Sequence, residues 1–150
     1  MKNRDEQAVM NFEKGFNCSQ AVFSVFASDS GLDEKLAQKI ASGFGGGIAR
    51  GGDICGVVTG GIMALGLKFF TTEGDIQQSK IKIYEIVREF KKRFEKQRGS
   101  IICRELLGCD ISTDEGFKKS LEQDLHNKIC KGLVRDAVEL IEGMTIQAKK

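Results

Sequence analysis

The sequence contains no proline, no tryptophan, one histidine and no Cys-x-x-Cys motif. The absence of proline in 150 residues favours long uninterrupted helices over a loop-rich fold. The missing Cys-x-x-Cys motif excludes thioredoxin-type redox motifs, zinc ribbons, c-type haem attachment and bacterial ferredoxin runs. Because the only histidine, His126, lies among polar neighbours, the sequence gives little support to a Cys–His nucleophile pair and predicts a solvated surface position.

Strong charge and long apolar runs are also missing. The formal net charge is +2, and no basic patch is interleaved with aromatic residues, so the sequence predicts no nucleic-acid partner. The longest apolar run, Ile54 to Phe70, contains four glycines. It falls short of the ~20 residues of a membrane span, which predicts a buried helix and no membrane insertion. Residues 1–15 lack the apolar segment of a signal peptide, so we expect a cytoplasmic protein.

The hydrophobic spacing and the turn residues predict an all-α fold. We expect one domain over residues 1–150, a compact helical bundle of about six to seven helices with a glycine-rich central helix. Asn17 is the predicted N-cap of the second helix, and Gly143 is predicted to end the last. Helical segments are predicted over about Arg4–Lys14, Cys18–Ala27, Asp33–Ser42, Ile54–Phe70, Asp75–Arg98 and Ser100–Leu107, after Thr113, and over Asn127–Glu142.

The glycines of the central helix need a physical reason, because each costs ~1 kcal/mol relative to alanine. Gly56, Gly60 and Ala64 lie four residues apart and form one smooth strip. A second helix backbone packed closely on that strip would offset the cost. Alternatively, the bare backbone gives a ligand or a second cysteine access to Cys55. The sequence leaves both explanations open.

Five cysteines are the other conspicuous feature of the chain. In a reducing cytoplasm, cysteines in number suggest metal binding or catalysis before structural disulfides. Cys18, Cys55 and Cys130 each share a helix face with apolar residues, so their sulfurs are expected to point inward. Cys18 and Cys55 are also predicted in the first turn of a helix, where unpaired N–H groups favour a thiolate and lower the pKa. The simpler alternative is that these cysteines are small buried hydrophobic residues.

Cys103 and Cys109 are six residues apart, which does not correspond to one helix face. Gly108 is predicted to end the short helix between them, so Cys109 is expected to orient independently. Cys103 is predicted near the start of that helix.

Five segments, taken in order along the chain, form one pattern: Asn17–Val22 (NCSQAV), Ser42–Gly47 (SGFGGG), Cys55–Gly60 (CGVVTG), Cys103–Gly108 (CRELLG) and Cys130. Together they resemble the C_GCAxxG_C_C family, small bacterial and archaeal proteins to which redox activity is ascribed. The four cysteines of the family pattern correspond to Cys18, Cys55, Cys103 and Cys130, which leaves Cys109 as an extra thiol. Val57 stands where the family motif has alanine.

The residues and the resemblance together support three hypotheses. In the first, the four cysteines carry out thiol–disulfide redox chemistry or electron transfer with a redox protein or a small thiol. Cys55 would be the reactive thiolate, and Cys18, Cys103 or Cys130 would resolve it. In the second, the same four thiolates bind an iron–sulfur cluster or zinc. In the third, the protein is a non-catalytic helical adaptor. The sequence alone determines neither an enzymatic activity nor an oligomeric state.

Overall fold

The computed structural model describes residues 3–150. Within that range the chain forms eight α-helices and no strand, apart from an isolated antiparallel bridge between Ile54 and Ile102. The predicted all-α fold is therefore confirmed. The described residues form one helix more than the expected six to seven, and each of the eight helices overlaps one of the predicted helical segments. The helices are α1 (Arg4–Glu13), α2 (Cys18–Ala27), α3 (Glu34–Ala41), α4 (Gly56–Phe69), α5 (Ile76–Arg98), α6 (Cys103–Leu107), α7 (Asp114–Glu122) and α8 (Lys131–Ala148).

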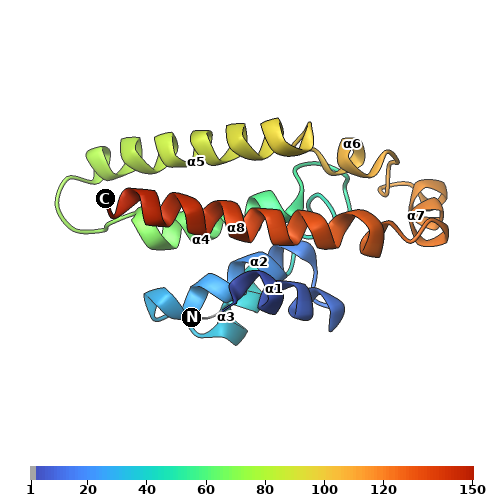
Figure 1. Ribbon diagram of the computed structural model, residues 1–150, viewed down its shortest axis with the longest axis horizontal. Coiled ribbons are helices and arrows are strands. Elements are labelled where there is room, and N and C mark those ends of the chain that lie inside the picture. Colours follow the sequence, from blue (N-terminus) through green and yellow to red (C-terminus); the bar gives the residue numbers. More distant parts are fainter. Residues whose placement is uncertain (1–2) are drawn as a thin grey trace.

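Figure 1 shows how the helices are arranged. The long α5 crosses the top of the view, α4 and α8 run through the middle, and α1, α2 and α3 lie below. The short helices α6 and α7 gather at one end of the molecule. The largest fully buried side chains come from the four helices α2, α4, α5 and α8, which therefore supply the centre of the core: Phe90, Phe94, Leu65, Leu133, Ile141, Val22, Val57, Val58, Val134 and Val138.

The start of α2 is fixed by its predicted N-cap. The Asn17 side chain accepts a hydrogen bond from the Gln20 N–H at 2.9 Å, and the Gln20 side chain accepts one from the Asn17 N–H at 2.9 Å. This reciprocal pair is a capping box, which satisfies two otherwise unpaired helix N–H groups. It places Cys18 at the first residue of α2, as the sequence predicts.

The boundaries of α4 and α8 differ from the predicted ones. α4 begins at Gly56, so Cys55 is its N-cap and not part of its first turn. α8 continues past Gly143 to Ala148, because Met144, on the added turn, is buried in the core. That burial outweighs the ~1 kcal/mol cost of a helical glycine. The residues just before α8, His126–Cys130, form a π-helical turn and not the start of an α-helix.

The glycine strip of α4 faces the N-terminus of α2. A Cβ atom on Gly60 would lie 2.6 Å from the Ser19 carbonyl oxygen, so this glycine permits close backbone packing. A Cβ atom on Gly56 would lie 2.2 Å from the Cys18 sulfur, so this glycine gives a second cysteine room beside Cys55. Close helix packing therefore explains Gly60, and access of a second cysteine to Cys55 explains Gly56. No helix among the described residues is long and apolar enough to cross a membrane.

Candidate functional site: a cavity lined by four cysteines

The four cysteines that match the family pattern line a single cavity of about 990 Å³. They come from four separate elements: the start of α2, the N-cap of α4, the start of α6 and the π-helical turn before α8. This convergence is what the helix-face spacing of Cys18, Cys55 and Cys130 predicts. All five cysteines of the chain are free thiols. The chemical role of each cysteine remains a prediction.

Backbone pairing holds Cys55 and Cys103 on the same side of the site. The Cys55 N–H donates to the Ile101 carbonyl at 2.8 Å, and the Cys103 N–H donates to the Asp53 carbonyl at 2.6 Å. These bonds flank the bridge between Ile54 and Ile102. Because side chains alternate along paired extended segments, Cys55 and Cys103 project to the face opposite those two isoleucines. The short pairing therefore positions two of the four thiols.

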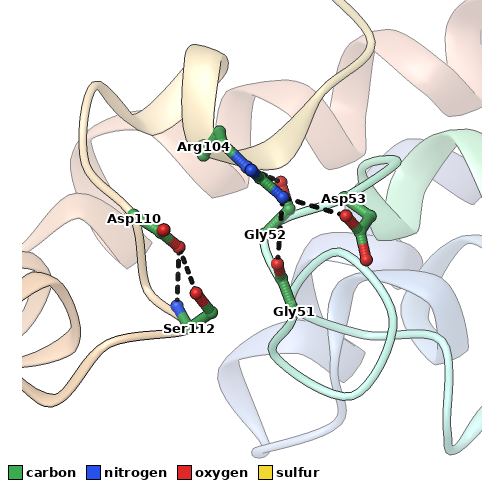
Figure 2. A network of polar contacts seen from close by, with 6 residues as sticks. All are labelled: Gly51, Gly52, Asp53, Arg104, Asp110 and Ser112. Carbon is green, nitrogen blue, oxygen red and sulfur yellow. Dashed lines mark hydrogen bonds and ion pairs between the residues drawn. The ribbon is translucent and has the colours of Figure 1, made fainter.

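Arg104 fastens the same two segments together, as Figure 2 shows. Its Nε donates to the Gly52 carbonyl at 3.0 Å, and its Nη2 contacts the Gly51 carbonyl at 3.3 Å and Asp53 Oδ1 at 2.9 Å. Arg104 directly follows Cys103, and Asp53 lies two residues before Cys55. This contact could not be predicted from the sequence, because nothing in the local pattern links residues about 50 positions apart.

The glycine-rich loop adopts an unusual left-handed turn beside the cavity. Residues 46–50 all have positive φ, with values of 66° at Ile48, 48° at Ala49 and 60° at Arg50. This conformation costs roughly 1–2 kcal/mol for each residue that is not glycine. Backbone hydrogen bonds within the loop compensate, including Asp53 N–H to the Gly47 carbonyl at 3.0 Å. The glycines of residues 43–47 are typical of a turn, but nothing in the sequence signals that the three residues after them are left-handed.

The loop and two helix ends surround the Cys18 sulfur with backbone donors. Burial raises the pKa of the Cys18 thiol, while hydrogen bonds from the N–H groups of Gly46, Ser19 and Gly56 lower it. Burial is the larger effect, so the pKa is raised overall. These N–H donors would stabilise a Cys18 thiolate, which a purely apolar pocket could not do.

The other three cysteines of the cavity also have raised pKa values. At Cys55 burial is the main cause, and the charge of Cys18 adds to it, so its pKa lies well above the ordinary value. At Cys103 and Cys130 burial, with smaller contributions from neighbouring thiols, raises the pKa to about 12. The expectation that a helix start lowers the pKa of Cys18 and Cys55 is therefore wrong, because desolvation outweighs the helix-end effect at both thiols.

Cys109 lies near enough to the site to influence two of its thiols. Its charge raises the pKa of both Cys103 and Cys130, although Cys109 is not among the residues that line the cavity. His126 is exposed, as predicted, and its ring lies 4.9 Å from that of Phe12 at the edge of the cavity. This aromatic contact was not predicted.

The side chains do not form a ready site for a single metal ion. Among residues 3–150, no group of three or more histidine, cysteine, aspartate or glutamate side chains is arranged to hold one. Four thiols are a suitable donor set for zinc or an iron–sulfur cluster, but their present placement does not meet that requirement.

Comparison with known proteins supports the resemblance seen in the sequence. A family model described as "Putative redox-active protein (C_GCAxxG_C_C)" matches residues 16–144, which include all five cysteines. No curated protein and no solved structure matches the chain. Since the matched region covers most of the chain, this protein belongs to the C_GCAxxG_C_C family.

Proposed function

We propose that the protein carries out thiol–disulfide redox chemistry inside the cysteine-lined cavity. The observation that supports this most strongly is the convergence of Cys18, Cys55, Cys103 and Cys130 on one cavity from four separate elements. Chance burial of cysteines as small apolar residues would not favour a shared cavity. The convergence therefore also weakens the hypothesis of a non-catalytic adaptor with structural cysteines.

Cys18 and Cys55 are the first pair in this proposal. The Cys18 sulfur lies against Gly56, the residue next to Cys55, and Cys18 is the neighbouring thiol with the largest effect on the Cys55 pKa. Cys18 is half-buried and has backbone N–H donors for a thiolate, whereas Cys55 is buried. These features favour Cys18 as the thiol that meets an incoming reactant and Cys55 as the thiol that resolves it, which reverses the roles expected from the sequence.

The half-reaction joins the two sulfurs. Each thiol loses its proton, the S–S bond forms, and two electrons and two protons pass to an acceptor that enters the cavity. A small thiol or a redox protein reverses the reaction: its thiolate attacks the Cys18 sulfur and releases Cys55, and a second thiol then releases Cys18. The protein thus alternates between dithiol and disulfide forms.

The test is oxidation of the reduced protein with diamide under anaerobic conditions, followed by peptide mapping. We expect a disulfide between Cys18 and Cys55 within one chain, both in the wild-type protein and in the Cys109→Ser variant. Disulfides found only between chains, or only through Cys109, would contradict the proposal. The same anaerobic preparation should be analysed for iron and zinc. Stoichiometric metal that is lost in the Cys18→Ser variant would favour the metal-binding hypothesis instead.

A further inference from the structure

One face of α7 and the turn after it border the cavity that the cysteines line. Four of the lining residues in this segment recur three or four positions apart, which is the spacing of a single helix face: Asp114, Phe117, Leu121 and Asp124. Two carboxylates and an aromatic ring therefore border the same space as the thiols. A reactant that enters the cavity meets charged groups on its way to them.

Arg50 packs on this face from the left-handed loop. Its guanidinium carbon lies 3.8 Å from the centre of the Phe117 ring. Among residues 3–150, no carboxylate lies within ion-pairing distance of Arg50. A guanidinium held over an aromatic ring keeps N–H donors for a second partner. Arg50 therefore presents a positive charge at the cavity wall that the described part of the chain does not neutralise.

The loop that carries Arg50 also contacts the Cys18 thiol. The Gly46 N–H forms a hydrogen bond with the Cys18 sulfur. A Cβ atom on Gly46 would lie 3.0 Å from the Arg50 Cα, and the Arg50 N–H donates to the Gly45 carbonyl at 3.2 Å. The Arg50 backbone is thus packed against the residue that contacts the thiol. This packing fixes the base of the Arg50 side chain close to the thiol that meets the incoming reactant.

A small disulfide built from amino acids carries charges that complement this lining. Its carboxylates match the guanidinium, which binds them through paired N–H donors. Its ammonium groups match Asp114 and Asp124, neither of which has an ion-pair partner among the described residues. These counter-charges offset the hydration that a charged ligand loses in a cavity. We propose that the cavity binds amino-acid disulfides, and that Arg50 holds a carboxylate of the disulfide while Cys18 attacks its sulfur.

This inference rests on the proposed thiol–disulfide function and names the oxidant of the dithiol. The Cys18 thiolate attacks one sulfur of the small disulfide and releases the other half, which leaves as a thiol with the proton that Cys18 lost. The Cys55 thiolate then attacks the Cys18 sulfur and releases the second half, which leaves as a thiol with the Cys55 proton. The protein gains one S–S bond and the small disulfide loses one, so no other oxidant is needed.

Cystine and cystamine are matched probes for the test, because cystamine is cystine without its two carboxylates. Bis(2-hydroxyethyl) disulfide is the uncharged probe. The reduced Cys109→Ser protein is mixed with each probe under anaerobic conditions, and peptide mapping of quenched samples follows the Cys18–Cys55 disulfide. Each rate constant is divided by that of the same probe with dithiothreitol, which removes differences in intrinsic reactivity.

Three variants test the role of the guanidinium. Arg50→Gln removes the charge, and Arg50→Lys keeps the charge without the paired N–H donors. Arg88→Gln is the matched change of an exposed arginine on α5 that does not line the cavity. All three are made in the Cys109→Ser protein.

We expect cystine to react faster than the uncharged probe after normalisation. Arg50→Gln should lower the cystine-to-cystamine ratio of rate constants about tenfold, because a charge-assisted hydrogen bond to the carboxylate is lost. Arg50→Lys should lower the ratio about threefold, which carries the test if Arg50→Gln does not fold. Arg88→Gln should leave the ratio unchanged.

A ratio that does not respond to Arg50, a ratio that falls equally in Arg88→Gln, or cystine that reacts no faster than the uncharged probe would overturn the inference. If diamide forms the Cys18–Cys55 disulfide but one of these results is obtained, only this inference fails. If diamide does not form that disulfide, the proposed function fails as well.

Discussion

The two ends of the molecule differ in the regularity of their backbone. Among the described residues, the non-glycine residues with positive φ are Ile48, Ala49, Arg50 and Asp124, and all lie in segments that border the cysteine-lined cavity. At the opposite end, α4 leads through a short loop into the regular 23-residue helix α5. Unfavourable conformations persist only where surrounding contacts enforce them, and they cluster at functional sites. The contrast indicates that the cavity end is the specialised part of the fold.

The helix α4 connects the two regions. Replacing its glycines with alanine should change the free energy of unfolding in opposite directions at Gly60 and at Gly66. Gly60→Ala would place a Cβ atom 2.6 Å from the Ser19 carbonyl oxygen, and we expect it to reduce the free energy of unfolding by about 1–3 kcal/mol. Gly66 has open space around it, and Gly66→Ala should increase that free energy by about 0.5–1 kcal/mol. Urea denaturation of both variants measures this difference. Shifts in the same direction would show that the two halves of α4 are packed alike.

The raised thiol pKa values predict that the protein loses stability in alkali. In the folded state Cys130 holds its proton up to a pKa of about 12, whereas in the unfolded chain the value is near 9.0. As pH rises above 9, the unfolded state loses protons first, so stability falls. Replacing Cys130 with serine should remove about 1 kcal/mol of the loss between pH 9 and 10. Identical pH profiles of wild-type and variant protein would contradict the pKa assignment at this end of the molecule.

The smallest expected change in stability is at the left-handed turn, compared with a matched substitution in the regular helix α5. Ala49 has a φ of 48°, so Ala49→Gly should relieve strain and stabilise the protein by up to about 1 kcal/mol. Lys92→Gly, in the middle of the regular α5, should instead destabilise it by about 0.5–1 kcal/mol. Thermal unfolding of the two variants checks the signs. Destabilisation by Ala49→Gly would indicate that the turn is not strained.

The sequence predicts the regular helices of this fold better than it predicts the cysteine-lined cavity. The capped helices and the inward direction of Cys18 and Cys130 follow from local spacing, which needs no knowledge of distant contacts. The left-handed conformation of Ile48 and the contact of Arg104 with Asp53 depend on segments far apart in the chain. The raised thiol pKa values depend on burial, which acts against the helix-start effect that the sequence shows.

The central claim is that Cys18 belongs to one reversible thiol pair in the cavity. It is tested most directly by equilibrating the Cys109→Ser protein with mixtures of reduced and oxidised dithiothreitol and counting the remaining thiols. We predict a single two-electron transition that disappears when Cys18 is also replaced by serine, while the variant remains folded. A transition that persists without Cys18, or none in the Cys109→Ser protein, would contradict the account.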